Sequence, residues 1–202
     1  MRAEQCLGQV PGYTVCMPRI LLFDIDMTMV RTDGAGRGAM DAAFRQQFGI
    51  EQATEGMVFD GRTDHGIFNE CLERHGLGGR DLSSHFERIA ESYLDHLPGR
   101  LAEKGGVVLP GVRELLGALA DEDAVVGLAT GNLRRGAAHK LRHFGLWEHF
   151  AGGGFGDRHT VRAELVRDGI AELETKFGLA AGSAGVIVLG DTPLDIDAAH
   201  LA

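Results

Sequence analysis

The chain has 202 residues, of which 44% are hydrophobic and 24% charged, a balance typical of a globular protein rather than a disordered chain. Its 29 acidic residues outnumber its 20 basic ones, and the net charge of −9 argues against non-specific nucleic-acid binding. A protein of this charge needs a metal ion or a local cluster of donors to bind an anion. The length fits one large domain, or a core with a small insert.

The cysteines and the hydropathy pattern indicate a cytoplasmic protein with no membrane partner. Cys6, Cys16 and Cys71 form no CxxC pair, so neither a disulfide framework nor a structural zinc site is expected. No apolar run approaches the roughly 18 residues of a membrane span, and the N-terminus lacks the apolar stretch of an ordinary signal peptide. We interpret residues 1–17 as an N-terminal extension that folding does not require.

Short apolar runs predict buried strands, and amphipathic stretches between them predict helices. Residues 56–59 are a weaker strand candidate, and Pro98 is expected to end a helix. In chain order we expect a strand at 19–23, helices at 39–48, 67–74, 82–97 and 112–119, a strand at 124–129, helices at 137–144 and 162–177, a strand at 186–189 and a helix from Asp195.

The alternation of strands and helices predicts an α/β fold with a mostly parallel sheet. Residues 32–105 are largely helical, so we interpret them as a helical insert between core segments 18–31 and 106–202. The glycines at positions 34, 36 and 38 suit a hinge into this insert. Residues 152–156, which are rich in glycine, are expected to form a loop near the site.

The clearest chemical signal is the pair Asp24 and Asp26, which comes directly after the first strand and is followed by Thr28. Ligands of α/β sheets bind beyond the carboxyl ends of the strands, and two carboxylates this close favour a bound cation. One interpretation is a Mg²⁺ site in which one aspartate is a nucleophile and the other an acid/base. The alternative is a turn or a helix cap at the end of a strand.

Two further strands end in polar residues of the same kind. The second strand leads into Thr130, Gly131 and Asn132, whose hydroxyl and backbone N–H groups can bind phosphate oxygens, or else form a helix cap with a glycine turn. The third leads into Asp191, with Asp195 one helical turn later. Three strand ends that carry such groups to one edge of a sheet favour a shared metal and phosphate site.

The segments FDIDMT, LATGN and LGDTPLD resemble the first, second and fourth motifs of the haloacid dehalogenase-like superfamily, whose members are mostly phosphatases. The chain looks closest to the phosphoglycolate phosphatase-like branch with a helical cap, and the match runs from about residue 18 to the last residue. This resemblance implies a Rossmann-like three-layer α/β/α core, a Mg²⁺ cofactor and an aspartyl-phosphate intermediate.

The same resemblance implies a role for each motif residue. Asp24 would be the nucleophile, Asp26 the general acid/base with its carbonyl on the metal, and Thr130 a ligand of the transferring phosphoryl group. Asp191 would bind Mg²⁺ with the support of Asp195. Thr28, Gly131 and Asn132 are further phosphate-binding candidates. Met27 stands where the family most often has glycine, so we expect it to crowd the turn.

The basic residue that the family uses before its fourth motif has two candidates. Arg162 opens the helix before the third strand, and the resemblance favours it because the basic residue usually stands there in relatives. A guanidinium can also bind phosphate in a bidentate way. Lys140 is the competitor, with an exposed helix face as its alternative interpretation. His139 and His143 are spaced to share a metal ion, but an exposed helix face is favoured for them too.

Within the insert, Gly61 to Asp64 resembles a segment of the cap that faces substrate in relatives. Arg62 and Asp64 are therefore candidates for substrate specificity, and an ordinary helix N-cap is the alternative.

We therefore expect a Mg²⁺-dependent phosphatase that acts on a small phosphorylated metabolite, as a monomer or homodimer. A phosphosugar mutase of the same superfamily is one alternative. Another is a catalytically weak member that serves as a binding partner, because relatives continue beyond the position of Ala202 through at least one more strand and helix. Without them, an edge strand would be left uncovered.

Overall fold

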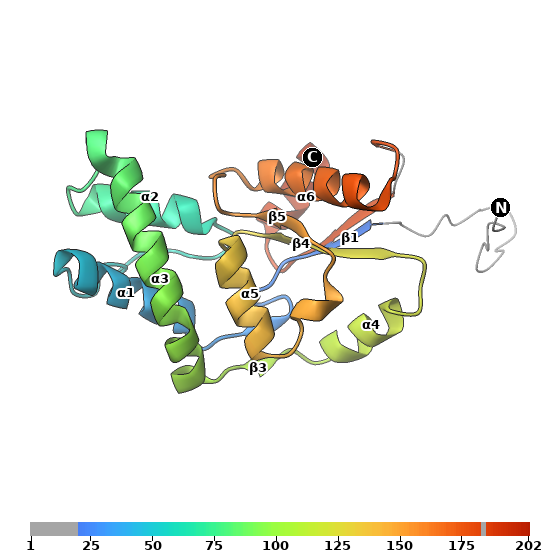
Figure 1. Cartoon of the computed structure of the whole chain (residues 1–202), viewed down its shortest axis with the longest axis horizontal. Coiled ribbons are helices and arrows are strands. Elements are labelled where there is room, and N and C mark those ends of the chain that lie inside the picture. The colour runs from blue at the N-terminus through green and yellow to red at the C-terminus, as the bar shows by residue number, and fades with distance from the viewer. Residues whose placement is uncertain (1–19, 183–184) are drawn as a thin grey trace, which may run out of the picture.

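The structure is a computed structural model that describes residues 20–182 and 185–202 (Figure 1). The expected extension at residues 1–17, including Cys6 and Cys16, lies outside the described residues. The central sheet has four parallel strands in the order β5–β4–β1–β6. These strands are β1 (Ile20–Phe23), β4 (Val125–Thr130), β5 (Gly153–Phe155) and β6 (Val186–Leu189).

Helices cover both faces of this sheet and give the core three layers (Figure 1). In β1, Phe23 packs on one face and Leu22 on the other, because neighbouring side chains of a strand point in opposite directions. The predicted α/β fold with a mostly parallel sheet is confirmed. One face carries α4 (Val112–Leu119), α5 (Arg134–His143) and the short η2 (Trp147–His149), and the other carries α6 (Arg162–Phe177) and α7 (Pro193–Leu201).

A bundle of helices stands between β2 (Val30–Arg31) and β3 (Val107–Val108). These two strands pair antiparallel, so the chain enters and leaves the bundle at one place. We propose from this pairing that residues 32–105 are an inserted cap on a core formed by residues 18–31 and 106–202. The helices are α1 (Ala35–Phe48), α2 (Asp64–Arg74), η1 (Gly79–Asp81) and α3 (Leu82–Lys104), and their buried side chains form a core of their own.

The expected hinge at the first three glycines of the insert is wrong for Gly36 and Gly38, which lie in a helix. α1 begins at Ala35, four residues earlier than predicted, so Gly36 and Gly38 are helical. Only Gly34, with φ +83°, forms the turn before the helix. The backbone of Gly36 packs beside the ammonium of Lys140, which explains why a small residue suits this position.

Helix α3 also continues further than predicted, past Pro98 to Lys104. The buried side chains of Leu97 and Leu101 extend the apolar stripe of the helix across the proline. Their packing outweighs the loss of one backbone hydrogen bond at Pro98. Among the described residues, no helix combines the length and the apolar character that a membrane crossing requires.

Two segments have a different secondary structure from the one that the sequence predicts. Residues 56–59 form a turn and irregular backbone rather than a strand. The guanidinium of Arg37 donates hydrogen bonds to two backbone carbonyl groups of this region, those of Thr54 and Met57. Residues 152–156 contain strand β5 rather than only a loop, and glycines serve there because the backbones of β4 and α6 come very close.

The packing of β5 against α6 predicts a severe cost for any side chain at Gly154. A Cβ on Gly154 would lie 1.6 Å from the carbonyl oxygen of Leu165, an atom of a helix backbone that cannot move aside. We expect Gly154→Ala to lower the free energy of unfolding by about 3 kcal/mol or more, measured by denaturant or thermal unfolding.

Gly117→Ala is the matched control. Gly117 lies in α4 with open space around its Cβ position, so alanine should raise the free energy of unfolding by up to about 1 kcal/mol. Equal effects of the two alanines would contradict the close approach of β5 and α6.

Candidate active site

The carboxyl ends of β1, β4 and β6 lie at the edge of the sheet that faces the helical bundle (Figure 1). A cavity of about 360 Å³ lies there, lined by residues of both the core and the bundle. Of the predicted site residues, nine line this cavity, and they are Asp24, Asp26, Arg62, Asp64, Gly131, Asn132, Lys140, Arg162 and Asp191. The predicted neighbourhood of these residues is therefore present in the folded chain.

Asp24 stands at the end of β1, where its backbone N–H donates to the carbonyl of Leu189 on β6 at 2.8 Å. The side chain is buried, and the guanidinium of Arg162 lies 3.0 Å from its carboxylate. Burial raises the pKa of Asp24 to about 6, against the opposing effect of Arg162. The arrangement keeps a desolvated carboxyl group against a fixed cation at the edge of the cavity.

Arg162 is the first residue of α6, and its side chain extends to the carboxyl ends of β1 and β4. Besides Asp24, its Nη2 lies 2.6 Å from Asp195 Oδ1, and both ion pairs are buried. Nη1 donates to the carbonyl of Gly61 in the bundle at 3.3 Å, and Nη2 to that of Ala129 at the end of β4 at 3.4 Å. One side chain thus connects two strand ends, the acidic group and the insert.

Asp26 lies in the turn after β1, and its side chain is 40% exposed. Its Oδ2 accepts hydrogen bonds from Lys140 Nζ at 2.6 Å and from Asn132 Nδ2 at 2.8 Å. Met27 follows with φ +62°, so the turn does place this residue in the left-handed region that favours glycine. Both basic candidates reach the site, Lys140 at Asp26 and Arg162 at Asp24.

The residues after β4 form a tight polar loop. Thr130 is completely buried, and its hydroxyl oxygen accepts from the side-chain and backbone N–H groups of Asn132 at 2.8 and 3.3 Å. At Gly131 a Cβ would lie 2.1 Å from the carbonyl oxygen of Arg62, so the loop and the insert are in direct backbone contact. Gly131 and Asn132 line the cavity, whereas the completely buried Thr130 is not among the lining residues that the structure describes.

The acidic residues after β6 complete a possible metal site. One carboxylate oxygen each from Asp24, Asp191 and Asp195 lies within 4.8 Å of the others, the only such group that the described residues form. Asp24 and Asp195 are buried, and Asp195 Oδ1 lies 2.6 Å from Arg162 Nη2. Hard carboxylate oxygens of this kind fit a divalent cation such as Mg²⁺.

Neighbouring residues explain why the segment around this acidic group contains glycine and threonine. Asp195 Oδ2 accepts from the N–H and the hydroxyl of Thr192 in a capping box at the start of α7. A Cβ on Gly190 would lie 2.1 Å from the Asp195 carboxyl carbon, so only glycine leaves room for it. The hydroxyl of Thr28 lies 3.3 Å from Asp191 Oδ1, which places Thr28 beside an acidic residue rather than free for phosphate.

Arg62 and Asp64 both line the cavity, and each also contacts another group of the protein. Asp64 Oδ2 accepts from the backbone N–H of Leu133 at 2.9 Å, at the start of α5, while its own N–H donates to the carbonyl of Gly131 at 2.7 Å. The helix N-cap of α2 is Thr63, not Asp64. Arg62 lines the cavity but is paired with Glu70 at 2.7 Å.

Tyr93 is one of the cavity residues that the sequence did not assign to the site. Tyr93 fits the apolar stripe of α3, and in the structure it is buried, yet it also lines the cavity. Its hydroxyl lies near Gly36 and Gly136, which are the small residues that face it from α1 and α5. Only the spacing of a polar tip among apolar positions marks such a residue, and many core tyrosines share that pattern.

The contact between Asp64 and α5 predicts an unusual pH effect. Burial raises the pKa of Asp64 from 3.8 to about 6, so its ionisation opposes folding, and this cost is absent at pH 3 and complete above pH 6. Asparagine keeps the acceptor for Leu133 N–H but cannot ionise. We expect Asp64→Asn to raise the free energy of unfolding at pH 7.5 by up to about 3 kcal/mol, and by little at pH 3.5.

Asp64→Ala is the control that separates charge from hydrogen bonding. It removes the acceptor and leaves the Leu133 N–H buried and unpaired, so it should destabilise the protein at both pH values. Destabilisation by Asp64→Asn at pH 7.5 would show that the charge supports the fold instead of opposing it.

Solved structures with this architecture come from several bacteria, at low sequence identity. CbbY from Rhodobacter sphaeroides, in complex with phosphate, has a TM-score of 0.63 and 18% identity over 91% of this chain and 82% of that chain. A predicted phosphoglycolate phosphatase from Haemophilus somnus has a TM-score of 0.65 and 19% identity over 92% and 82%. A hydrolase from Pseudomonas syringae has a TM-score of 0.62 and 19% identity over 91% and 80%. These similarities establish the fold.

The family assignment comes from the sequence itself. A search of curated proteins finds no significant match. The model of the haloacid dehalogenase-like hydrolases matches residues 21–200, which is nearly the whole chain. The resemblance that the three motifs suggested is thereby confirmed, and the chain belongs to the haloacid dehalogenase-like hydrolase family.

Proposed function

We propose that the protein is a Mg²⁺-dependent phosphatase that hydrolyses a small phosphorylated metabolite through a phosphorylated Asp24. The observation that carries this proposal is the buried carboxylate of Asp24 at the edge of the cavity, beside the acidic group and held by Arg162. Asp26, two residues later, lies at the same cavity and is tied to Lys140. A nucleophile and an acid/base at one cavity suit a two-step hydrolysis.

In the first step, a carboxylate oxygen of Asp24 attacks phosphorus and the bond between phosphorus and the ester oxygen breaks. Asp26 in its protonated form gives a proton to the departing oxygen, so the alcohol leaves as a neutral molecule. In the second step, Asp26 takes a proton from water, which attacks the phosphorus and releases phosphate and the free Asp24 carboxylate. Dividing the reaction in this way replaces one difficult displacement by two easier ones.

The remaining polar residues hold these groups and the phosphoryl oxygens. Arg162 fixes the carboxylate of Asp24, and Lys140 and Asn132 fix that of Asp26. Thr130 offers a hydroxyl hydrogen at the end of β4. Asp24, Asp191 and Asp195 would hold Mg²⁺, which when bound supplies positive charge against the phosphoryl oxygens. The proposal includes the role that the family resemblance implies for the carbonyl of Asp26, which would also bind the metal ion.

The decisive experiment is phosphate release from an aryl phosphate with Mg²⁺ and with a chelator. We expect turnover that requires Mg²⁺ and falls at least about 10³-fold in Asp24→Asn, because the amide is not a nucleophile. Mass spectrometry of the quenched wild type should find a phosphoryl group on the peptide that contains Asp24. A folded protein without metal-dependent turnover would refute the phosphatase, and unchanged turnover in Asp24→Asn would refute the nucleophile.

A second test compares two lysines, each of which donates a hydrogen bond to an oxygen acceptor. Lys140→Ala removes the cation that fixes Asp26, so we expect kcat to fall about ten- to hundredfold. Lys176→Ala removes an exposed lysine that contacts only the carbonyl of Ala151, away from the cavity, and kcat should not change. Steady-state kinetics with the same aryl phosphate measures both, and a kcat that Lys140→Ala leaves intact would contradict this role.

A further inference from the structure

Four of the five cationic side chains that line the cavity in the described part of the chain contact a carboxylate. Arg31 forms an ion pair with Asp33 at 2.7 Å, and Arg62 forms one with Glu70 at the same distance. Lys140 and Arg162 are bound to the reacting aspartates and their neighbours. Among the described lining residues, none of these four offers a free charge for a second anionic group of a substrate.

Arg37 is the remaining cationic residue of the cavity wall. Its Nη1 and Nη2 donate to the carbonyls of Thr54 and Met57 at 2.8 and 2.9 Å, and its guanidinium lies 4.1 Å from the centre of the Phe59 ring. The side chain therefore serves to hold the segment before α2 in place. Moving it toward a ligand would leave two carbonyl groups without their donor and remove its stacking on the ring.

The cavity wall also carries a free negative charge. Asp60 is exposed, lines the cavity and forms no ion pair with the described residues. A carboxylate or a second phosphate on the leaving group would lose hydration on entry and be repelled by Asp60, while Arg37, the described lining cation without a carboxylate partner, is held by two backbone carbonyls. Met40, Phe59 and Ile67 supply apolar surface to the same cavity. These properties disfavour anionic leaving groups.

Two polar atoms of the cavity residues lack a partner, and they are complementary. The hydroxyl of Tyr93 forms no hydrogen bond with the described residues, although Tyr93 is 1% exposed. Burial raises the pKa of this phenol well above its usual range, with a further contribution from Asp64 and Asp26, so it remains a donor. Asn132 Oδ1 is a buried acceptor without a donor.

The orientation of the Asn132 amide is fixed by its neighbours. Its Nδ2 donates to both Asp26 Oδ2 and Thr130 Oγ1 at 2.8 Å, and the reverse orientation would place two acceptor oxygens together. Asn132 therefore holds Asp26, the proposed acid/base, and the Tyr93 hydroxyl lies beside Gly36, which also adjoins the Lys140 ammonium bound to the same carboxylate. The Tyr93 hydroxyl and Asn132 Oδ1, which lack partners among the described residues, therefore belong to residues near Asp26, which would protonate the leaving oxygen.

We propose that the cavity selects monophosphate esters of a neutral alcohol that carries a further hydroxyl group, which Tyr93 and Asn132 recognise. This inference rests on the proposed phosphatase function and names the class of its substrate. A hydroxyl group both donates and accepts, so it satisfies the Asn132 oxygen and the Tyr93 phenol, which an apolar or anionic leaving group leaves unpaired. Substrates with a carboxylate or a second phosphate near the ester are disfavoured by charge.

The test compares kcat/KM for three small esters, glycerol 1-phosphate, propyl phosphate and phosphoglycolate, with an aryl phosphate as the reference. We expect glycerol 1-phosphate to exceed each of the other two small esters by at least about tenfold, which corresponds to one or two hydrogen bonds. Tyr93→Phe keeps the ring and removes the hydroxyl, so the ratio of glycerol 1-phosphate to propyl phosphate should fall about tenfold.

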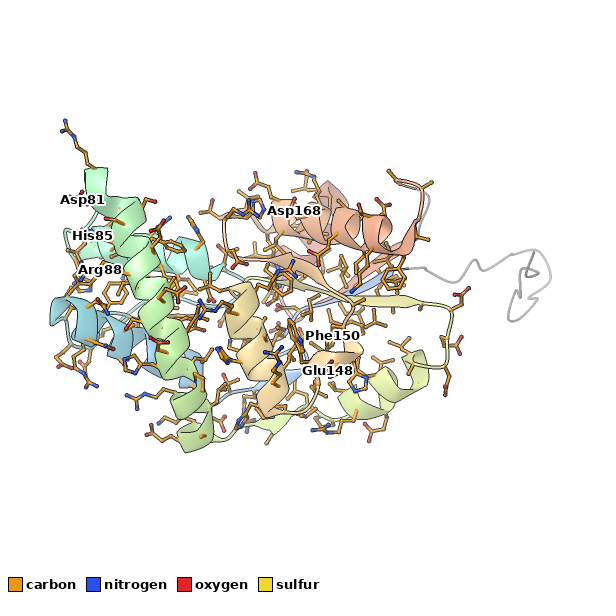
Figure 2. The ribbon with its side chains drawn as sticks, viewed as in Figure 1. Asp81, His85, Arg88, Glu148, Phe150 and Asp168 are labelled. Carbon is orange, nitrogen blue, oxygen red and sulfur yellow. The ribbon has the colours of Figure 1, made fainter. Side chains whose placement is uncertain are left out.

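Ser84→Ala is the matched hydroxyl deletion on the same helix. Ser84 lies between Asp81 and His85, which Figure 2 labels at the end of α3 remote from the sheet, and its hydroxyl donates to the carbonyl of Asp81. This variant should leave the ratio unchanged. Thermal unfolding of Tyr93→Phe verifies that the variant is folded before its kinetics are compared.

The outcomes separate this inference from the function on which it rests. Hydrolysis of the aryl phosphate that requires Asp24, together with a preference for phosphoglycolate or an unchanged ratio in Tyr93→Phe, would overturn the substrate class alone. Isomerase activity that depends on a sugar bisphosphate would overturn it as well, because that reaction requires a site for a second phosphate. Absence of metal-dependent turnover with every ester would overturn both proposals.

Discussion

The buried contacts of Arg162 with Asp24 and Asp195 are the constraint on which the site depends. Two carboxylates from different strand ends share one desolvated guanidinium, and removal of a partner from such a buried arrangement typically costs about 3–5 kcal/mol. The same guanidinium donates to the carbonyl of Gly61. The position of the proposed nucleophile, the acidic group after β6 and the nearest segment of the insert are therefore set together by the first residue of α6.

A second joint fixes the insert on the core through backbone atoms. The N–H of Asp64 donates to the carbonyl of Gly131, and the N–H of Leu133 donates to the carboxylate of Asp64. His65 continues this joint, because its N–H donates to Gly156 and its ring nitrogen Nδ1 lies 2.9 Å from the carbonyl of Asp157. Gly131 has no side chain because the insert already fills that space. The start of α2 is thus attached to the core beside the site.

The distribution of charge in the cavity bears on the proposed function of this acidic chain. Arg162 and Lys140 contact the proposed reacting groups, two other lining cations are paired with Asp33 and Glu70, and Arg37 is held by backbone carbonyls. The group of carboxylates after β1 and β6 is the candidate site for the proposed metal ion. Under the proposed substrate class, the phenol and the amide oxygen without partners among the described residues would discriminate by hydrogen bonding rather than by charge.

The sequence by itself determined the parts that depend on local order. Apolar runs defined β6, the apolar periodicity defined α4 and α6, and the polar residues that follow β1, β4 and β6 identified the site edge, because parallel strands bring their carboxyl ends together. Only the tertiary structure decided that α3 continues through Pro98, that a glycine run forms β5, and that Asp64 accepts a hydrogen bond from the backbone of Leu133. Each of these results from contact with a distant segment, namely the buried leucines beside the proline, the backbone of α6 against Gly154, and the start of α5 beside the insert. Side-chain periodicity records which face of an element is buried, but it does not record which backbone atoms of another element lie against that face.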